Sequence, residues 1–358
     1  MSFYTSSSEN HRHYVFWLIF LALIPPLVLF LLGVFLEPLY GDLTRIGSYS
    51  EREFGWSKPQ LTFSKPLYFT RYSRYHDVVV LGDSFSTGSP QHQWQNYLVS
   101  YSNWSVVTLN INSTKFESVL ENRVFREKPP KIFVYESVER DFYSRINALP
   151  PCDGSEFRQN SKRTNQAQFV RLEHEGSSRY VEREKNWNDV KLGFVMKYLR
   201  NNFWRTFFNE ERSDARKIAL SQTAPFSSAN RQEMLVYKDD FKKISSLQKI
   251  SAREVDCRIE RMRQQVEVNG KTRFVLIVAP DKLTAYSDFI SDEKLRNISK
   301  LNQLSESNRK IIPRIDLALM KAIGNGEQDV YLPDDTHWGS SGHRIAAETL
   351  IDFLQNQD

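Results

Sequence analysis

An uncharged apolar segment near the start of the chain constrains its fold more than any other feature. The stretch YVFWLIFLALIPPLVLFLLGVFL, from Tyr14 to Leu36, contains no charged side chain. About 20 apolar residues in a helix are enough to cross the hydrocarbon core of a bilayer. Pro25 and Pro26 lie in the middle of the segment, a position that membrane helices tolerate. We therefore predict a transmembrane anchor over residues 14–36.

A cleavable signal peptide is the alternative interpretation of this segment. Its apolar core is normally shorter, and no small-x-small cleavage site follows here. His11, Arg12 and His13 precede the segment, whereas Glu37 and Asp42 follow it. This charge distribution favours a short cytoplasmic tail, residues 1–13, with everything after the anchor on the other side of the membrane.

Composition excludes some function classes and leaves others open. Lys and Arg number 48 against 43 Asp and Glu, a net charge of +5. Because no basic module with interleaved stacking aromatics accompanies this mild excess, we expect no nucleic-acid partner. Cys152 and Cys257 are the two cysteines. They could form a disulfide in an oxidising compartment or be two unrelated thiols.

Apolar runs alternate with helical patterns after the anchor. We expect strands at 77–82, 105–111, 131–136 and 273–280, a short strand at 329–333, and helices at 90–102, 187–208, 244–262, 291–305, 313–323 and 340–355. Continuous apolar strands separated by helices are typical of a parallel sheet covered on both faces. The sequence thus predicts a juxtamembrane segment, 37–75, and one α/β domain, 76–358, with a basic helical insertion at about 145–235.

One helix in this insertion is unusually aromatic. Its apolar residues recur at helical spacing within residues 187–208. We favour a role in the core or as a lid, with docking onto a membrane partner as the alternative. The arginine-rich stretches nearby are interpreted as a solvated face, with binding of an acidic polysaccharide as the alternative.

A serine stands where the first strand of the domain ends, in VVVLGDSFSTGSP, residues 78–90. In open α/β sheets, ligands bind beyond the carboxyl ends of the strands. A hydroxyl held there, before a helix whose amides can stabilise an oxyanion, suits a nucleophile. The motif GDS alone is weak, because tight strand–helix turns favour Gly, Asp and Ser for backbone reasons. Ser84 is our candidate nucleophile, and Asp83 is expected to have a structural role in the turn.

A serine nucleophile requires a base that a third group orients. Among seven histidines, only His337 lies beside carboxylates in a loop that follows an expected strand, in YLPDDTHWGSSGH, residues 331–343. Asp335 precedes it by two residues. We therefore predict a triad of Ser84, His337 and Asp335, with Asp334 as the alternative orienting acid. No zinc-type spacing appears, so neither a metal nor another cofactor is expected.

Together these motifs resemble the SGNH/GDSL hydrolase superfamily, and within it the alginate O-acetyltransferase (AlgX/AlgJ-like) group. GDSFS and DTHW carry the resemblance, with GDLTRIGSYSEREFGW, YESVERDF, APDKLTAY and DVYLPDDTHWGSSGH in support. The resemblance implies a flavodoxin-like parallel sheet and an acetyl-handling enzyme of exopolysaccharide modification, anchored in the bacterial inner membrane with its catalytic domain in the periplasm. Ser84 matches the family's nucleophile, and Asp335 and His337 match its Asp-x-His pair, although here that pair follows the serine.

The rest of the family's site is altered in this chain. The second block lacks its glycine, since strand 105–111 leads into NINSTKF, and ESVERDF replaces the third block's Gly-x-Asn-Asp. We expect the amides of Ser84 and Ser113 to donate to the oxyanion, with help from Arg140. Glu136, Glu139 and Arg140 have either a substrate or oxyanion role or brace the loop as an ion-pair network. Trp338 either forms a wall of the site or packs beneath the loop.

The predicted function is that of a membrane-anchored O-acetyltransferase that passes an acetyl group through acetyl-Ser84 to polysaccharide hydroxyls. Because acetyl-CoA is cytoplasmic, the resemblance implies a membrane-bound O-acyltransferase as the donor-side partner. A polysaccharide acetylesterase with the same triad is the nearest alternative. A non-catalytic polysaccharide-binding or scaffold subunit is the second.

Overall fold

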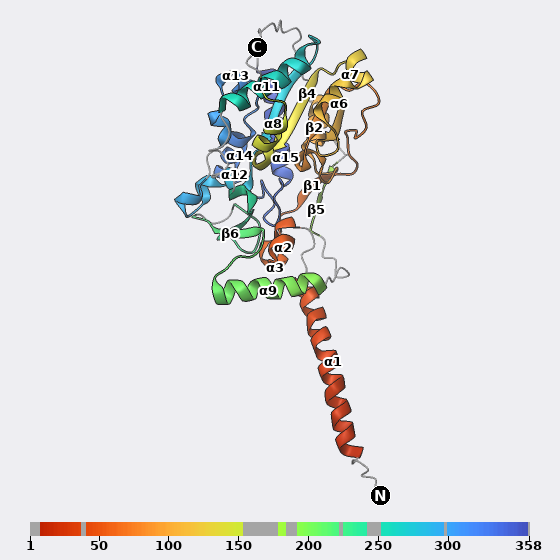
Figure 1. Cartoon of the computed structure of the whole chain (residues 1–358), viewed down its shortest axis with the longest axis vertical. Helices are drawn as coiled ribbons and strands as arrows, with labels where there is room; N and C mark the ends of the chain where they lie inside the picture. Colours follow the sequence, from red (N-terminus) through yellow and green to blue (C-terminus); the bar gives the residue numbers. More distant parts are fainter. Residues whose placement is uncertain are drawn as a thin grey trace.

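The computed structural model describes residues 8–36, 41–152, 178–183, 192–221, 225–241, 252–296 and 299–356. A long helix, α1 (Ser8–Leu36), projects from one end of an α/β domain (Figure 1). Its 29 residues correspond to about 43 Å at 1.5 Å per residue, and it runs through both internal prolines. It is long and apolar enough to span a membrane, as a single-pass anchor requires.

The domain is organised around four parallel strands in the order β3-β2-β4-β8. They are β2 (Val78–Gly82), β3 (Val106–Asn110), β4 (Ile132–Val138) and β8 (Arg273–Ala279). These are the four long apolar runs of the sequence, and β2 and β4 are buried along their whole length. The predicted α/β class with a parallel sheet is confirmed.

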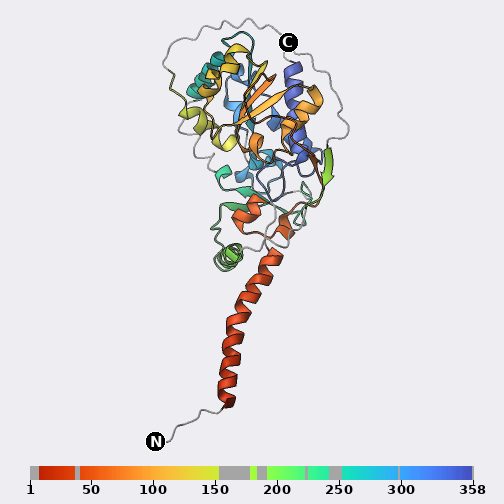
Figure 2. The ribbon, with the colours of Figure 1, turned by 90° about the vertical axis from the view of Figure 1, so that its right-hand side faces the viewer.

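Helices cover both faces of this sheet, because alternate strand residues enter two separate cores. Val78 and Val80 pack with α5 (Trp94–Ser102), α14 (Ile315–Gly324) and α15 (Ser340–Gln355). Val79 and Leu81 enter the other core with four further helices: α6 (Phe116–Glu121), α7 (Arg123–Glu127), α8 (Glu139–Ala148) and α11 (Ala252–Glu267). Figure 2 shows the two groups of helices on opposite sides of the strands.

A smaller layer lies between the sheet and α1. It contains α2 (Asp42–Gly47), α3 (Glu51–Phe54), the antiparallel pair β6 (Ala215–Ala219) and β7 (Glu233–Tyr237), and helix α9 (Leu192–Phe208). Leu43, Tyr49 and Phe54 share a third core with Ala215 and Leu235. The juxtamembrane segment thus packs on the domain.

Short elements complete the described chain. They are β1 (Gln60–Phe63), paired antiparallel with β5 (Ser178–Val181), and α4 (Ser84–Thr87), α12 (Lys282–Ala285), η2 (Ser287–Phe289), η3 (Glu293–Leu295), η4 (Lys300–Gln303) and α13 (Glu306–Arg309). The insertion at 145–235 is therefore not purely helical: its described part holds β5, β6 and the start of β7 besides α9. Residues 153–177, 184–191 and 222–224 of the insertion, and 244–251 of the helix predicted at 244–262, lie outside the described residues.

Two predicted elements are wrong. Residues 329–333 form no sheet strand, because the carbonyls of Leu332 and Pro333 accept hydrogen bonds from the Lys282 ammonium, and Tyr331 makes only an isolated bridge to Trp338. The helix expected at 291–305 is replaced by the short turns η3 and η4. The Asp292 side chain accepts from the Lys294 amide there, a local bond that competes with helix formation.

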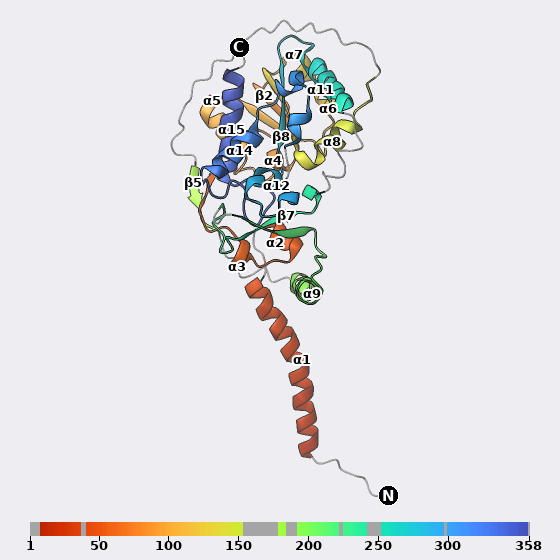
Figure 3. The same cartoon turned by 90° about the vertical axis from the view of Figure 1, so that its left-hand side faces the viewer.

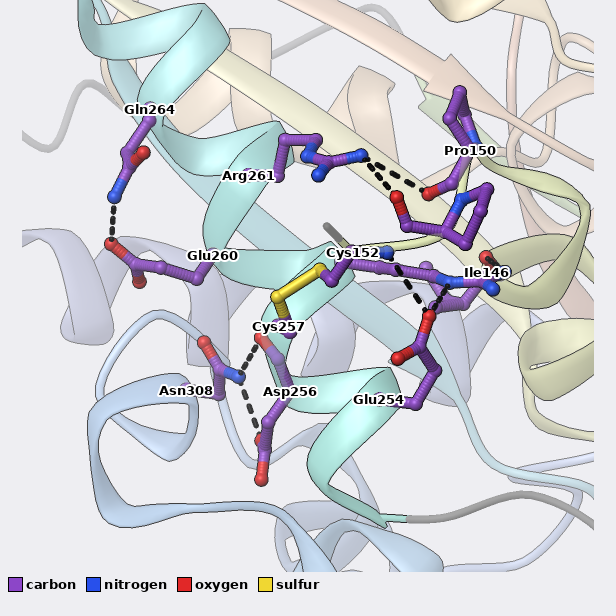
Figure 4. The surroundings of a disulfide bond; sticks show 12 residues. Ile146, Pro150, Cys152, Glu254, Asp256, Cys257, Glu260, Arg261, Gln264 and Asn308 are labelled. Atoms are coloured by element: carbon purple, nitrogen blue, oxygen red, sulfur yellow. Dashed lines mark hydrogen bonds and ion pairs between the residues drawn. A yellow bond between two sulfur atoms is a disulfide. The ribbon is translucent and has the colours of Figure 1, made fainter. Parts of the chain in front are cut away.

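A disulfide joins Cys152, just after α8, to Cys257 on α11, across 105 residues of sequence (Figure 4). Polar contacts support the same junction. The Glu254 carboxylate accepts from the Cys152 amide at 3.2 Å, and Arg261 donates to the carbonyls of Pro150 and Pro151. The alternative of two unrelated thiols is therefore not what the structure shows.

Reducing this disulfide is expected to lower the free energy of unfolding by about 2–5 kcal/mol, because the unfolded chain regains the freedom of a long closed loop. Urea denaturation of the whole chain with and without dithiothreitol measures the effect. The double variant Cys152→Ser, Cys257→Ser is the control, since reductant should leave its midpoint unchanged. Equal midpoints for the oxidised and reduced parent protein would contradict the expectation.

Candidate active site

Ser84 lies where β2 ends at the carboxyl edge of the sheet. Gly82 is the last strand residue, Asp83 caps the short helix α4, and Ser84 is the first residue of that helix. Within the described chain the Ser84 amide forms no hydrogen bond, whereas the two flanking amides are engaged. The Ser84 N–H is therefore available to an oxyanion that forms beside its own hydroxyl.

Asp83 holds the turn through its carboxylate. One carboxylate oxygen accepts from the Phe85 amide at 3.1 Å, and the other accepts from the Val138 amide at 2.7 Å and from the Arg145 guanidinium. Arg145 also donates to the Ser137 hydroxyl. The turn after β2 is thereby fixed to the end of β4.

Glu136 supports the same turn from below. Its side chain is fully buried, and Oε2 accepts from the Asp83 amide at 2.9 Å and from the Ser86 hydroxyl at 2.8 Å. Burial, and then the neighbouring Asp83 charge, raise the pKa of Glu136 well above its usual range. The side chain is enclosed by the turn, which fits a bracing role rather than contact with substrate.

Gly82 is required by this close packing. A Cβ there would lie 2.5 Å from Glu136 Oε2 and 2.7 Å from the Ser86 side chain. We expect Gly82→Ala to lower the free energy of unfolding by about 1–3 kcal/mol through overpacking and to displace Ser84. The matched control is Gly324→Ala at the end of α14, where an added Cβ meets nothing within 4 Å. Denaturant unfolding of both variants checks this, and equal stabilities would contradict it.

Asp335 and His337 form a hydrogen-bonded pair in the loop before α15. His337 Nδ1 lies 2.8 Å from Asp335 Oδ1, and the His337 amide donates to the same oxygen at 3.1 Å. The two-residue spacing allows one carboxylate to bind both the ring and the backbone of the histidine. This contact fixes the orientation of the imidazole, as an orienting acid does in a catalytic triad.

The electrostatics of the pair suit a base. Burial alone would raise the pKa of Asp335, but the charge and hydrogen bond of His337 outweigh it and hold that pKa well below its usual range. Burial alone would lower the pKa of His337, but the Asp335 carboxylate outweighs it and raises that pKa. The carboxylate thus stays ionised and strengthens the imidazole as a proton acceptor.

The imidazole of His337 lies close to the turn that holds Ser84. Nε2 is buried and has no hydrogen-bond partner among the described residues. The His337 ring lies 5.0 Å, centroid to centroid, from the ring of Phe85, the residue next to Ser84. The structure therefore brings the turn and the Asp–His loop together, but it contains no hydrogen bond between Ser84 Oγ and His337. Catalytic contacts of this kind are often long without substrate.

Lys282, which sequence reasoning missed, holds the Asp–His loop from beneath. Its ammonium donates to the carbonyls of Leu332 at 2.8 Å, Pro333 at 2.8 Å and Asp335 at 3.1 Å. Burial lowers the pKa of Lys282 to about 7, against the raising effect of nearby aspartates. The only sequence signal for this role of Lys282 was its position shortly after a strand, in APDK. Its hydrogen-bond partners are backbone carbonyls about 50 residues further along the chain.

The juxtamembrane segment closes over the same loop. The amides of Leu43 and Thr44 donate to the Asp334 carbonyl, and the Asp42 amide approaches Asp335 Oδ2 at 3.5 Å. A Cβ at Gly41 would lie 2.4 Å from the Asp334 carbonyl oxygen, so the two segments are in direct contact. The two segments are nearly 300 residues apart in the sequence, so no local pattern indicates that they meet.

Asp334, the alternative orienting acid, is turned away from the imidazole. Its side chain is buried beside Glu51, and its oxygens make no hydrogen bond to His337. Burial, and then the Glu51 carboxyl, raise the pKa of Asp334 well above its usual range. The geometry therefore favours Asp335 as the orienting acid.

Glu139 and Arg140 meet the α12 turn. Glu139 Oε2 accepts from the Asp281 amide at 3.0 Å and the Thr284 hydroxyl at 2.7 Å. Arg140 pairs with Asp281 at 3.0 Å and Asp240 at 3.7 Å. These contacts fit the bracing interpretation. The positive charge of Arg140 lowers the pKa of His337 and so partly offsets the rise caused by Asp335. Arg140 is therefore close enough to belong to the site.

The two other predicted residues have other surroundings. The Ser113 amide already donates to the Asn110 carbonyl at 3.1 Å, and the side chain is exposed, so the geometry does not favour an oxyanion role. Trp338 is buried and packs edge-on against Phe85 at 4.8 Å. It lies beneath the loop, the second of the two interpretations offered for it.

Three side chains near this loop could also be considered as ligands of a metal ion. Asp42, Asp335 and His337 each offer one ligand atom within 4.8 Å of the others. The Asp335–His337 hydrogen bond, however, uses the ring nitrogen that faces the carboxylate. We therefore assign Asp335 and His337 to a hydrogen-bonded pair and propose no metal site here.

Residues 235–358, about a third of the chain, match the family model of the SGNH hydrolase-like domain of acetyltransferase AlgX. The match contains β8, Lys282 and the Asp335–His337 loop, but not Ser84. No curated protein and no solved structure matches the chain.

Proposed function

Because this chain carries an SGNH hydrolase-like domain of the AlgX type, which supports an acetyltransferase-type role, we propose that it is a membrane-anchored O-acetyltransferase acting on a polysaccharide. The observation that carries the proposal is the oriented Asp335–His337 pair, which has an unbonded Nε2 and whose imidazole packs close to Phe85, the residue next to Ser84. The periplasmic side of a bacterial inner membrane is the proposed location, and the disulfide supports an oxidising compartment.

The proposed mechanism has two half-reactions, acetylation of Ser84 and transfer of the acetyl group to a sugar hydroxyl. His337 Nε2 takes the proton from Ser84 Oγ as that oxygen attacks the carbonyl carbon of an acetyl ester or thioester. The leaving group departs with the proton, leaving acetyl-Ser84. His337 then takes a proton from a sugar hydroxyl, whose oxygen attacks the acetyl carbon and releases Ser84 Oγ, which recovers the proton. Asp335 stabilises the imidazolium in both halves, and the Ser84 amide stabilises the oxyanion.

The position of the site relative to α1 supports a donor in the membrane. Five residues lie between Leu36, the end of α1, and Asp42, whose amide approaches the Asp335 carboxylate. At about 3.5 Å per residue, Asp42 lies within about 21 Å of the end of α1, and the Asp335 carboxylate within about 25 Å. A membrane-bound O-acyltransferase is the proposed donor-side partner, because it would release acetyl groups at the membrane surface, within this distance of the site.

Product analysis tests transfer against hydrolysis. The whole chain in nanodiscs is incubated with an activated acetyl ester, with and without unacetylated acidic oligosaccharides of the alginate type. We expect acetylated oligosaccharide to be the main product. Free acetate as the main product with every sugar would favour the esterase. No turnover, with the Ser84→Ala variant indistinguishable from the parent protein, would favour the scaffold.

The rate of acetyl transfer is expected to rise with pH. Only the neutral imidazole can accept the Ser84 proton, and Asp335 raises the pKa of His337, so the inflection should lie above the ordinary value of 6.5. Loss of the carboxylate in Asp335→Asn should move the inflection of the residual rate to lower pH. Burial lowers the pKa of His343 to about 3, which removes it from this window. A rate profile that is flat between pH 5 and 8 would contradict His337 as the base.

A further inference from the structure

Helix α9 displays an apolar face that no described part of the chain covers. Its exposed apolar residues recur at positions i, i+4, i+7, i+11 and i+15, which places them on one side of a helix. These residues are Leu192, Met196, Leu199, Phe203 and Phe207, and each is between 41% and 70% exposed. A soluble helix normally turns such a face toward the core.

The opposite face of α9 fixes the helix to the domain. Phe194 and Val195 are buried, and the Asn201 amide donates to the Ser48 hydroxyl at 3.2 Å. Arg205 pairs with Glu211 at 2.6 Å and donates to the Ser48 carbonyl. These contacts hold the apolar residues outward. The exposed face is therefore part of the folded arrangement.

The orientation of α9 relative to α1 indicates what covers this face. In Figure 1, α9 lies crosswise at the domain end of α1, with α2 and α3 on its other side. In Figure 3 the view runs along the axis of α9, while α1 is still seen along its full length. The two helices also contact each other. If α1 crosses a bilayer, α9 lies parallel to the bilayer surface at the level where α1 leaves it.

The charges of α9 suit the same position. Lys197, Arg200 and Arg205 are its ionisable cations, and the helix contains no Asp or Glu. Arg200 is exposed beside the apolar face, and the guanidinium of Arg212 covers the Trp204 ring at 3.3 Å. Interfacial helices combine an apolar face with cations that contact anionic headgroups, and aromatic residues favour the interface.

We propose that α9 is an interfacial helix whose apolar face is buried in the lipid leaflet next to the domain. This inference rests on the proposed membrane anchor. It departs from our preferred expectation of a core or lid helix, since this face is exposed on the described domain. Lipid is favoured over a protein partner because α9 lies crosswise at the domain end of α1 and the cation Arg200 lies beside the exposed face.

The proposal gives the site a fixed height and tilt above the membrane. A single helix with a short linker leaves the domain free to swing, whereas a second contact at α9 removes that freedom. Through Ser48, α9 contacts the segment that begins at Gly41, and this segment contacts the Asp335 loop. The catalytic loop is thus connected to the bilayer surface by packed protein on one side.

Site-specific fluorescence quenching tests the proposal on the whole chain. Phe203→Cys is labelled with a thiol-reactive NBD dye and reconstituted, one chain per nanodisc, in phosphatidylethanolamine and phosphatidylglycerol. Nanodiscs contain lipids with a nitroxide either near the headgroup or deep in the acyl chain. Two control variants carry the same dye at other positions. They are Leu23→Cys within α1 and Val268→Cys just after α11, where Val268 is 83% exposed.

We expect the label at 203 to shift its emission to the blue and to be quenched at least twofold more by the shallow nitroxide than the label at 268. The label at 23, quenched by the deep nitroxide, reports the anchor itself. Quenching at 23 with none at 203 would overturn the interfacial helix, leave the anchor intact and indicate a protein partner for the face. No quenching at 23 would overturn the anchor and the inference that rests on it.

Discussion

Replacing Asp335 by asparagine is expected to lower the turnover number about 10⁴-fold, while Asp334→Asn stays within a few-fold of the parent protein. An amide in place of the Asp335 carboxylate cannot stabilise the imidazolium and can favour the wrong tautomer of His337, an effect of this size in an Asp–His–Ser system. Asp334 differs because its side chain is buried beside Glu51, which raises its pKa, and it does not contact the imidazole.

The two variants form a matched pair, because each changes one carboxyl to a near-isosteric amide at adjacent positions. Steady-state acetyl transfer to oligosaccharide, with circular dichroism to confirm the fold, provides the measurement. The opposite order of activities would assign the orienting role to Asp334. Equal and small effects would remove the Asp–His pair from the mechanism.

The second large effect is expected at Lys282, which we predict to be a positioning residue. Lys282→Met preserves the length of the side chain but removes the donors to three loop carbonyls. A buried carbonyl left without a donor costs about 1–3 kcal/mol, and of the three contacts only the one to Pro333 is fully buried, so we expect the free energy of unfolding to fall by about 1–3 kcal/mol. The loop should also lose its fixed position, which lowers turnover in the molecules that remain folded.

Lys321→Met provides the control, because Lys321 is an exposed lysine on α14. Denaturant unfolding gives the stability of each variant, and turnover below the unfolding transition separates positioning from folding. A Lys282→Met protein with the stability and turnover of the parent protein would show that the three carbonyls do not depend on this ammonium.

The sequence predicts the parts of this molecule that depend on local pattern. The four central strands are long apolar runs, and each occurs where the sequence suggests. The Asp335–His337 pair is also local, since a two-residue spacing brings acid and ring together within one loop. The position of Ser84 follows from a general rule about strand ends in parallel sheets.

The unpredicted parts depend on contacts between distant segments. Lys282 binds backbone carbonyls, which carry no residue identity for a sequence pattern to reveal. The contact between Asp42 and Asp335 joins residues 293 positions apart. The predicted strand at 329–333 failed for a related reason, because its alternating apolar residues are buried in a loop whose carbonyls are held by Lys282.

The measurement that tests the central claim most directly is the intact mass of the whole chain after brief exposure to an activated acetyl ester without acceptor. The account predicts a population heavier by one acetyl group, with the modification mapped to Ser84 and lost when oligosaccharide is added. It also predicts no such population for Ser84→Ala. Acetylation that persists in Ser84→Ala, or that maps elsewhere in the chain, would contradict the assignment of Ser84 as the nucleophile.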